Sequence, residues 1–189
     1  MKETFNHMLR EKNCTHILYP YESQELYLMN VVAYVTDGIE SGDSVVIIEN
    51  ERNLDLIFTQ LNKQLSEEQL EKIEAVSNFE FYQSSGSYHP PAIFEELKKN
   101  IAPYLENDIS FRTWTHVEWG SLENPTHIVE WFENETDIVM HKYNMDVVCA
   151  YDSEKMPADL KASLRNNHPH IMTDNDIIES NSYKPQEVK

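Results

Sequence analysis

The sequence predicts an α/β domain with a mostly parallel central sheet of five to six strands and helices on both faces. Short apolar runs recur along its 189 residues, and amphipathic stretches of helical length separate them. Such alternation is typical of parallel strands joined by right-handed helical crossovers. Hydrophobic residues make up 40% of the chain, which is enough to build the core of one domain of this size.

The predicted strands are short apolar or aromatic runs bounded by polar residues, proline or glycine. The second and the fifth, residues 44–48 and 145–150, are so uniformly apolar that we expect both of their faces to be buried. In chain order, strands are predicted at residues 15–19, 44–48, 79–82, 111–119, 145–150 and 171–172.

The predicted helices show apolar positions at spacings of three and four, together with local signals at their ends. Gly42 is suited to end the first helix, and Pro91 fits the first turn of a later one. Ser66 and Gln69 form a capping box at the start of a short helical piece. In chain order, helices are predicted at residues 22–41, 54–65, from 66 onward, 91–104, 125–142 and 157–166.

Composition divides the chain into three parts. Residues 1–13 are polar and mixed in charge, and we interpret them as an N-terminal extension that is not a secretory signal. Residues 14–174 carry the predicted strands and helices and form the α/β domain. Residues 175–189 are polar and are predicted to be a flexible tail.

The charge excludes some classes of partner. The chain has 33 acidic and 15 basic residues, a formal net charge of -18, without a basic cluster. We therefore expect no direct binding to nucleic acid or to an anionic membrane. No run approaches the roughly 20 apolar residues that span a bilayer. Cys149 lies in an apolar run where a buried reduced thiol is the ordinary outcome, so a cytoplasmic location is expected.

The residues that open the domain resemble a known sensory family. Three blocks, HILY at 16–19, NVVAYV at 30–35 and GIESGD at 38–43, are similar to the start of the MEDS domain. This is the sensory domain of methanogens, methylotrophs and the dichloromethane regulator DcmR. The later blocks that agree with it are Arg112 with Trp119, and residues 148–152 followed by His168 and Pro169. The resemblance covers residues 16–183, nearly the whole chain.

The resemblance implies a degenerate relative of RecA/KaiC-type ATPase domains that senses small ligands or signals. Such domains occur alone or fused to histidine kinases and DNA-binding domains, so a signalling partner of the histidine kinase or transcription regulator class is implied. Two positions depart from the family pattern. His116 stands where a Glu is usual, with Glu118 displaced by two, and Ala150 follows Cys149 where a Gln is usual. If these positions touch a ligand, the ligand of this chain differs from that of proteins with the usual family pattern.

The connection after the first predicted strand lacks the features of a phosphate-binding loop. Cradling phosphates needs a glycine-rich turn followed by Lys and Ser/Thr at the start of a helix. Residues 19–25 contain no glycine and no lysine, and Glu22 and Glu25 would repel a triphosphate. We expect neither tight binding nor hydrolysis of ATP.

Ligands of open α/β sheets bind outside the carboxyl ends of the strands. A mixture of aromatic walls and a few polar anchors suits a small organic ligand, and the predicted strand ends carry such a mixture. The candidate ligand-binding residues are Tyr21, Glu22, Glu49, His116, Glu118, Trp119, Tyr151 and Asp152. Asn50, Gln83 and Ser84 also follow predicted strands. We interpret Tyr21, Glu22, His116, Glu118 and Tyr151 as surface side chains, whose replacement shifts stability by only about 0.5 kcal/mol.

Two further interpretations concern tryptophans and histidines of the chain. Trp114 and Trp119 lie five apart, so on a regular strand they face opposite sides and one of them packs beneath a helix. Four histidines could join Glu118 or Asp152 around a metal, but none shows a familiar ligand spacing; they are His116, His141, His168 and His170. The sequence therefore predicts neither a metal site nor a cofactor, and Cys149 is interpreted as structural.

The leading hypothesis is a non-enzymatic signalling domain that binds a small ligand, a regulatory protein or both. An enzyme with diverged chemistry, using His116 and Glu118 as acid and base, is an alternative. An acidic adaptor without a ligand pocket is another. A cavity at the strand ends would favour sensing, and a filled sheet end would favour the adaptor.

Overall fold

The computed structural model describes residues 14–120 and 122–185. The expected extension at residues 1–13 lies outside the described part of the chain. The described strands are β1 (Thr15–Tyr21), β2 (Ser44–Glu49), β3 (Ile73–Ser77), β4 (Phe111–His116), β5 (Asp146–Asp152), β6 (His170–Met172) and β7 (Ile177–Glu179). They form one sheet in the order β3-β2-β4-β5-β1-β6-β7. Only the β6–β7 pairing is antiparallel among the described strands, which confirms the mostly parallel sheet.

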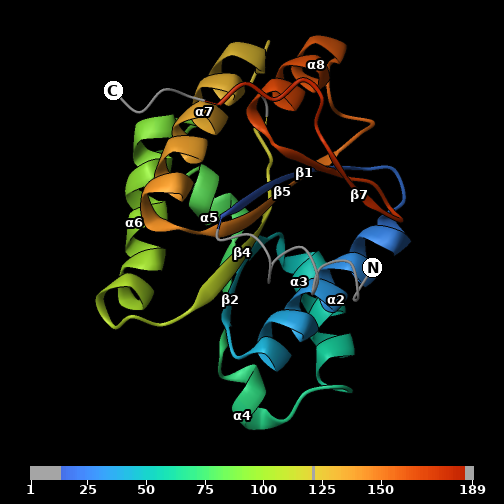
Figure 1. Ribbon diagram of the computed structural model, residues 1–189, viewed down its shortest axis with the longest axis vertical. Coiled ribbons are helices and arrows are strands. Elements are labelled where there is room, and N and C mark those ends of the chain that lie inside the picture. Colours follow the sequence, from blue (N-terminus) through green and yellow to red (C-terminus); the bar gives the residue numbers. More distant parts are fainter. Residues whose placement is uncertain (1–13, 121, 186–189) are drawn as a thin grey trace.

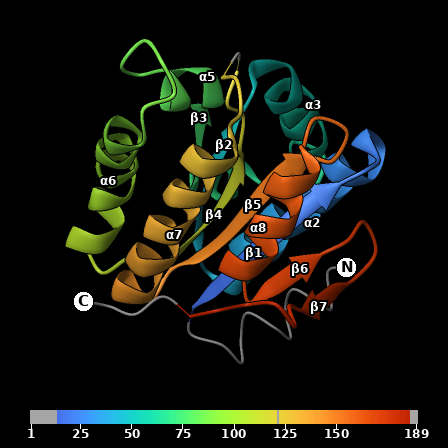
Figure 2. The same ribbon diagram turned by 90° about the horizontal axis from the view of Figure 1, so that it is seen from above.

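Helices cover both faces of this sheet, as the alternation predicts (Figure 1). Figure 2 shows α7 and α8 in front of the strands and α2 and α3 behind them. The described helices are α2 (Gln24–Ser41), α3 (Glu51–Leu61), α4 (Glu67–Leu70), α5 (Asn78–Tyr82), α6 (Pro90–Glu106), α7 (Thr126–Tyr143) and α8 (Ala158–Asn167). No described helix is long and apolar enough to cross a membrane.

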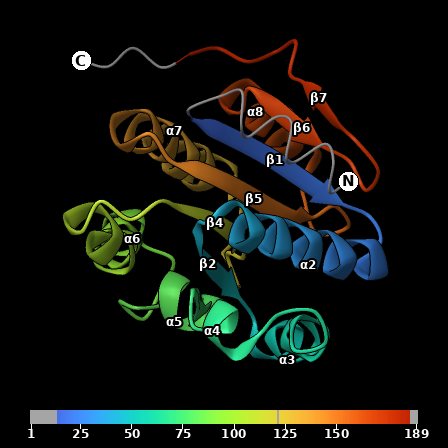
Figure 3. The same ribbon diagram turned by 60° about the horizontal axis from the view of Figure 1, so that its bottom comes forward.

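Successive residues of a strand supply the two cores alternately, because strand side chains point to opposite faces. On β1, Ile17 and Tyr19 pack with α2 and α3, whereas Leu18 packs with α6, α7 and α8. In Figure 3, α7 and α8 lie on one side of β1 and β5, and α2 lies on the other side. Both faces of β2 and β5 are buried, as their uniform apolar character predicts.

Local signals define several helix ends. The Ser23 hydroxyl accepts a hydrogen bond from the Leu26 amide at the start of α2. Gly42 ends that helix with φ 97°, a left-handed conformation that glycine adopts at low cost. The predicted capping box of Ser66 and Gln69 is present at α4.

The prediction of a strand at residues 79–82 is wrong. These residues belong to α5, and the strand lies earlier, at β3. Phe81 and Tyr82 are both buried, whereas Phe79 is 72% exposed. A strand cannot bury two successive side chains on one face, but a helical turn can. β3 pairs with β2 alone and is only half-buried, so its sequence carries a weaker apolar signal.

The described part of the expected flexible tail is anchored to the domain. Residues of β7 add an antiparallel edge strand that is absent from the predicted elements, and the Lys184 amide donates to the Asn166 carbonyl at 2.9 Å. The Tyr183 hydroxyl donates to Asp137 on α7 at 3.1 Å. The two successive isoleucines at 177 and 178 are the apolar signal for this strand.

Candidate functional site

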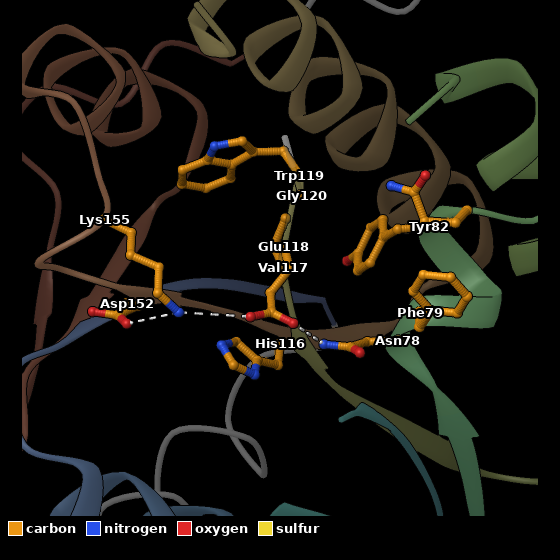
Figure 4. Close-up of a pocket in the computed structure, with 11 residues that line it drawn as sticks. Asn78, Phe79, Tyr82, His116, Val117, Glu118, Trp119, Gly120, Asp152 and Lys155 are labelled. Carbon is orange, nitrogen blue, oxygen red and sulfur yellow. Dashed lines mark hydrogen bonds and ion pairs between the residues drawn. The ribbon is translucent and has the colours of Figure 1, made fainter. Parts of the chain in front are cut away.

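A pocket of about 510 Å³ opens at the carboxyl ends of β3, β4 and β5, where the sequence places its candidate ligand site (Figure 4). Its lining combines aromatic and aliphatic side chains with a similar share of charged and amide groups. The lining residues are Asn78, Phe79, Tyr82, Gln83, His116, Val117, Glu118, Trp119, Gly120, Asp152 and Lys155.

Four of the eight predicted site residues line this pocket: His116, Glu118, Trp119 and Asp152. Polar contacts run across its floor in Figure 4. The Asn78 amide donates to Glu118 at 2.7 Å, and the Lys155 ammonium lies 3.7 Å from Glu118 and 3.1 Å from Asp152. The pocket therefore offers carboxylates, one ammonium and an amide within an aromatic enclosure.

Beneath the pocket, His116 is held by a buried hydrogen-bond network. Its Nδ1 lies 2.6 Å from Glu49 Oε1, and its Nε2 lies 3.1 Å from the Tyr21 hydroxyl. Glu49 is fully buried and also accepts hydrogen bonds from the Tyr27 hydroxyl and the Asn50 amide. Tyr21 and Glu49 thus do not line the pocket themselves, and both contact His116, which does.

Tyr151 and Glu22 lie outside this arrangement. Tyr151 is fully buried on the α7 side, where its hydroxyl donates to Glu133 and its ring centroid lies 6.2 Å from that of Trp119. Glu22 is exposed beside a separate hollow near β6.

The expectation that the site residues are surface side chains is wrong for three of them. Tyr21 is 5% exposed, His116 is 2% exposed and Tyr151 is 0% exposed. The polar atoms of His116 and Tyr151 face inward because the buried carboxylates of Glu49 and Glu133 provide acceptors for them. The Tyr21 hydroxyl faces inward towards His116 Nε2.

The two tryptophans of the β4 region lie in different places. Trp114 is fully buried beneath α2, where its indole N–H donates to the Tyr27 hydroxyl at 3.1 Å. The predicted strand extends to residue 119, but β4 ends at His116. Trp119 therefore lies in the loop and forms a wall of the pocket.

Sequence reasoning misses most of the aromatic and amide lining. Asn78, Phe79 and Tyr82 belong to α5, whereas the sequence predicts a strand over most of these residues. Gln83 follows that predicted strand and lines the pocket nonetheless. Lys155 follows Asp152 by three residues, and that spacing is the signal that could have found it.

The histidines considered as metal ligands do not form one group. His116 contacts Glu49, and His141 contacts the Asp137 carbonyl on its own helix. His168 instead lies 3.5 Å from Glu133, on the other side of the sheet.

The start of α2, where a phosphate-binding loop would lie, is closed by the chain itself. The Ser23 hydroxyl occupies the Leu26 amide, and Glu25 adds negative charge to the first turn. The cap uses one of the amides that would otherwise attract an anion, and the Glu25 carboxylate repels an anion.

Arg112, which carries part of the family resemblance, lies at the opposite end of β4 from the pocket. Its guanidinium is buried and pairs with Asp37 at 2.9 Å and with Asp43 at 2.8 Å. A Cβ atom on Gly38 would lie 2.9 Å from the Arg112 Cδ, so the helix passes close to this side chain. Arg112 is therefore a structural residue that ties α2 and its following turn to β4.

The His116 network makes stability depend on pH. Burial alone lowers the pKa of His116, but the hydrogen bond and charge of Glu49, helped by Glu118 and opposed by Lys155, raise it above its ordinary value of 6.5. The charged imidazole thus stabilises the folded state fully below pH 6.5, and this contribution is lost as pH rises through the folded pKa.

We expect the difference in unfolding free energy between wild type and His116→Gln to be largest at roughly pH 6 and to shrink towards about pH 9. Urea unfolding at several pH values measures it. A difference that stays constant, or that grows with pH, would contradict a raised pKa of His116.

Comparison with known proteins gives the family. The model of "MEDS: MEthanogen/methylotroph, DcmR Sensory domain" matches residues 15–169, which is most of the chain and includes every strand that borders the pocket. The chain belongs to the MEDS family. The resemblance of the sequence blocks is thereby confirmed, and the family name indicates a role in signalling.

A solved structure supports the fold of this MEDS domain. An ATPase domain matches with a TM-score of 0.55 and 10% identity, over 90% of this chain and 74% of that chain. This likeness shows a RecA-like arrangement of strands and helices and nothing about activity. No curated protein sequence matches the chain.

Proposed function

We propose that this MEDS domain is a non-enzymatic sensor that binds a small organic ligand at the carboxyl ends of β3, β4 and β5. One observation carries the proposal, namely the pocket of about 510 Å³ at the topological position where open α/β sheets bind ligands. Ligand sites commonly measure about 300–1,000 Å³ and combine apolar walls with a few polar anchors. A pocket at this place also argues against an adaptor with a filled sheet end.

The lining indicates the chemistry of the ligand. Phe79, Tyr82 and Trp119 suit an apolar or aromatic body. Glu118, Asp152 and Lys155 suit hydroxyl, amino or carbonyl groups at its edges. The ligand class is therefore a small molecule with an apolar body and several hydrogen-bonding groups.

The geometry favours binding over acid–base catalysis by His116 and Glu118. Both ring nitrogens of His116 are engaged within the protein, by Glu49 and by Tyr21. A general acid or base needs an atom that is free to exchange a proton with the substrate, and these contacts occupy both nitrogens of His116. Glu118 then lacks the acid–base partner that this alternative assigns to it.

We propose that ligand occupancy is passed to a protein partner of the histidine kinase or transcription regulator class in the cytoplasm. The net charge of -18 favours a partner with a basic face and speeds encounter with it. Cys14 and Cys149 are both free thiols, as suits a reducing compartment.

Mg-ATP is expected neither to bind tightly nor to be hydrolysed. The start of α2 is capped by Ser23 and carries Glu22 and Glu25 instead of a glycine-rich loop with a lysine. Isothermal titration and a phosphate-release assay check this. A micromolar dissociation constant, or phosphate release above the buffer rate, would overturn it.

The ligand site is tested by a thermal-shift screen of small polar-aromatic molecules, followed by isothermal titration of the compounds that stabilise the chain. A ligand present at a hundred times its Kd stabilises the folded state by about 2.7 kcal/mol. Lys155→Gln removes the ammonium from the pocket and is expected to weaken binding about tenfold, or about 1.4 kcal/mol. The Lys155 side chain is 63% exposed, so the fold should be unaffected.

Lys98→Gln is the matched control, because Lys98 is also exposed and paired with a carboxylate but lies on α6, outside the pocket. Equal affinities of the two variants for every compound found would place the ligand elsewhere.

A further inference from the structure

Four fully buried side chains with metal-binding atoms converge on one point on the α7 side of the sheet, away from the ligand pocket. They are His16, Glu133, Cys149 and His168, and their ligand atoms all lie within 4.8 Å of one another. The four residues come from β1, α7, β5 and the residue that ends α8. Distant parts of the chain therefore meet here.

Three separations between these ligand atoms match the edges of a tetrahedral zinc site. His16 Nε2 lies 3.3 Å from Glu133 Oε2 and 3.5 Å from Cys149 Sγ. His168 Nε2 lies 3.5 Å from the same Glu133 oxygen. Zinc bonds of about 2.0–2.3 Å in a tetrahedron place neighbouring ligand atoms about 3.3–3.6 Å apart.

The outer nitrogen of each histidine is already oriented. His168 Nδ1 lies 2.8 Å from the Leu164 carbonyl, which only accepts hydrogen bonds, so this nitrogen carries the proton. His16 Nδ1 lies 3.2 Å from the Asp137 carboxylate, which the Tyr183 hydroxyl also contacts. Metal-binding histidines are held in this way, by a carbonyl or carboxylate on the nitrogen that faces away from the metal.

Two of the inward-facing atoms, His168 Nε2 and Glu133 Oε2, lack a hydrogen-bond partner within the described residues. Because the proton of the neutral His168 imidazole lies on Nδ1, its Nε2 presents a lone pair. That lone pair faces the Glu133 Oε2 atom, and neither atom makes a hydrogen bond within the described part of the chain. Two buried acceptors facing each other are unfavourable unless a cation lies between them.

We propose that His16, Glu133, Cys149 and His168 bind one Zn²⁺ ion. Binding converts the Cys149 thiol to a thiolate and leaves both imidazoles neutral, and the displaced protons go to solvent. The charges of the thiolate and of Glu133 then balance those of the ion. The thiolate and imidazoles exclude hard cations such as Ca²⁺ and Mg²⁺, which require oxygen ligands.

The site has the character of a structural zinc site, because four protein ligands leave no open position for a substrate. It would link β1, β5 and α7 to the segment that leads into β6. Tyr151 lies between this site and the ligand pocket, with its hydroxyl on Glu133 and its ring near Trp119.

The test uses the full chain, which is first unfolded in guanidinium with reductant and chelator. It is then refolded with Co²⁺ or Zn²⁺, so that the metal can reach its ligands before they are buried. We expect one zinc ion per chain after dialysis, measured by inductively coupled plasma mass spectrometry. The cobalt form should show a thiolate-to-cobalt charge-transfer band and the intense visible bands of tetrahedral cobalt.

Cys149→Ser should lose the charge-transfer band, whereas the matched variant Cys14→Ser should keep it. His168→Gln should weaken zinc binding, measured by competition with a chromophoric chelator, by more than about 100-fold. Asp137→Asn, which alters only the residue that positions His16, should weaken it by about 10–100-fold.

The cobalt spectrum of the wild-type chain tests the proposed metal site even if a variant fails to fold. A wild-type chain that holds no metal after dialysis, or that holds cobalt without a thiolate band, would overturn the assignment. Loss of the band in Cys14→Ser with retention in Cys149→Ser would overturn it as well.

Discussion

Replacing Arg112 by alanine is expected to lower the free energy of unfolding by about 3–5 kcal/mol. The guanidinium is a charged partner of Asp37, which is 1% exposed, and it also pairs with Asp43. Removing one partner of a buried ion pair leaves much of the other charge without compensation. In a domain of this length the melting temperature should fall by on the order of 10 °C.

Two variants make the Arg112 result interpretable. Arg52→Ala removes an exposed arginine from α3 and should change stability by less than about 0.5 kcal/mol. Arg112→Lys keeps the charge but cannot reproduce the forked contacts with Asp37 and Asp43, so an intermediate loss is expected. Denaturant unfolding gives all three values. An unchanged midpoint for Arg112→Ala would show that the pair does not hold α2 against β4.

His116→Ala is expected to lower the free energy of unfolding by about 3–5 kcal/mol, because it too removes one partner of a buried ion pair. Glu49 is fully buried and relies on the His116 imidazole as its charged partner. Alanine also leaves the Tyr21 hydroxyl without its contact on His116 Nε2. The sequence alone predicts the opposite, namely a surface residue that is replaced at little cost.

Glu118→Gln provides the comparison within the same pocket. Glu118 follows His116 by two residues but lies in the loop, and its side chain is 38% exposed. We expect this variant to melt within a few degrees of wild type. If His116→Ala melts as Glu118→Gln does, the Glu49–His116 pair contributes nothing to stability, and the account of the network is wrong.

The sequence predicts the layered α/β fold because its signals are local. The runs at β2 and β5 and the caps at Gly42 and Ser66 depend on neighbouring residues alone. The wrong prediction of a strand at residues 79–82, which form part of α5, shows where local signals fail. Residues 79–82 alternate aromatic and polar side chains at first, yet the helix is set by how Phe81 and Tyr82 pack against α6 and α7.

The position of the candidate site is predictable from topology, but the roles of its residues are not. Parallel strands end at one edge, so His116, Glu118 and Asp152 meet there as expected. Which polar side chains turn inward depends on acceptors from other elements. Glu49 lies 67 residues from His116 in sequence and Tyr21 lies 95 residues from it, so no local pattern reveals either contact.

The central claim, a small organic ligand in the strand-end pocket, is tested most directly by native mass spectrometry of the full chain purified gently from its own host. The account predicts that wild type and Lys98→Gln carry a small organic molecule, and that Trp119→Ala, which removes one wall of the pocket, carries much less. A bound zinc ion is distinguished by its own mass and should persist in all three. Wild type without any organic adduct, or an adduct retained equally in Trp119→Ala, would contradict the account.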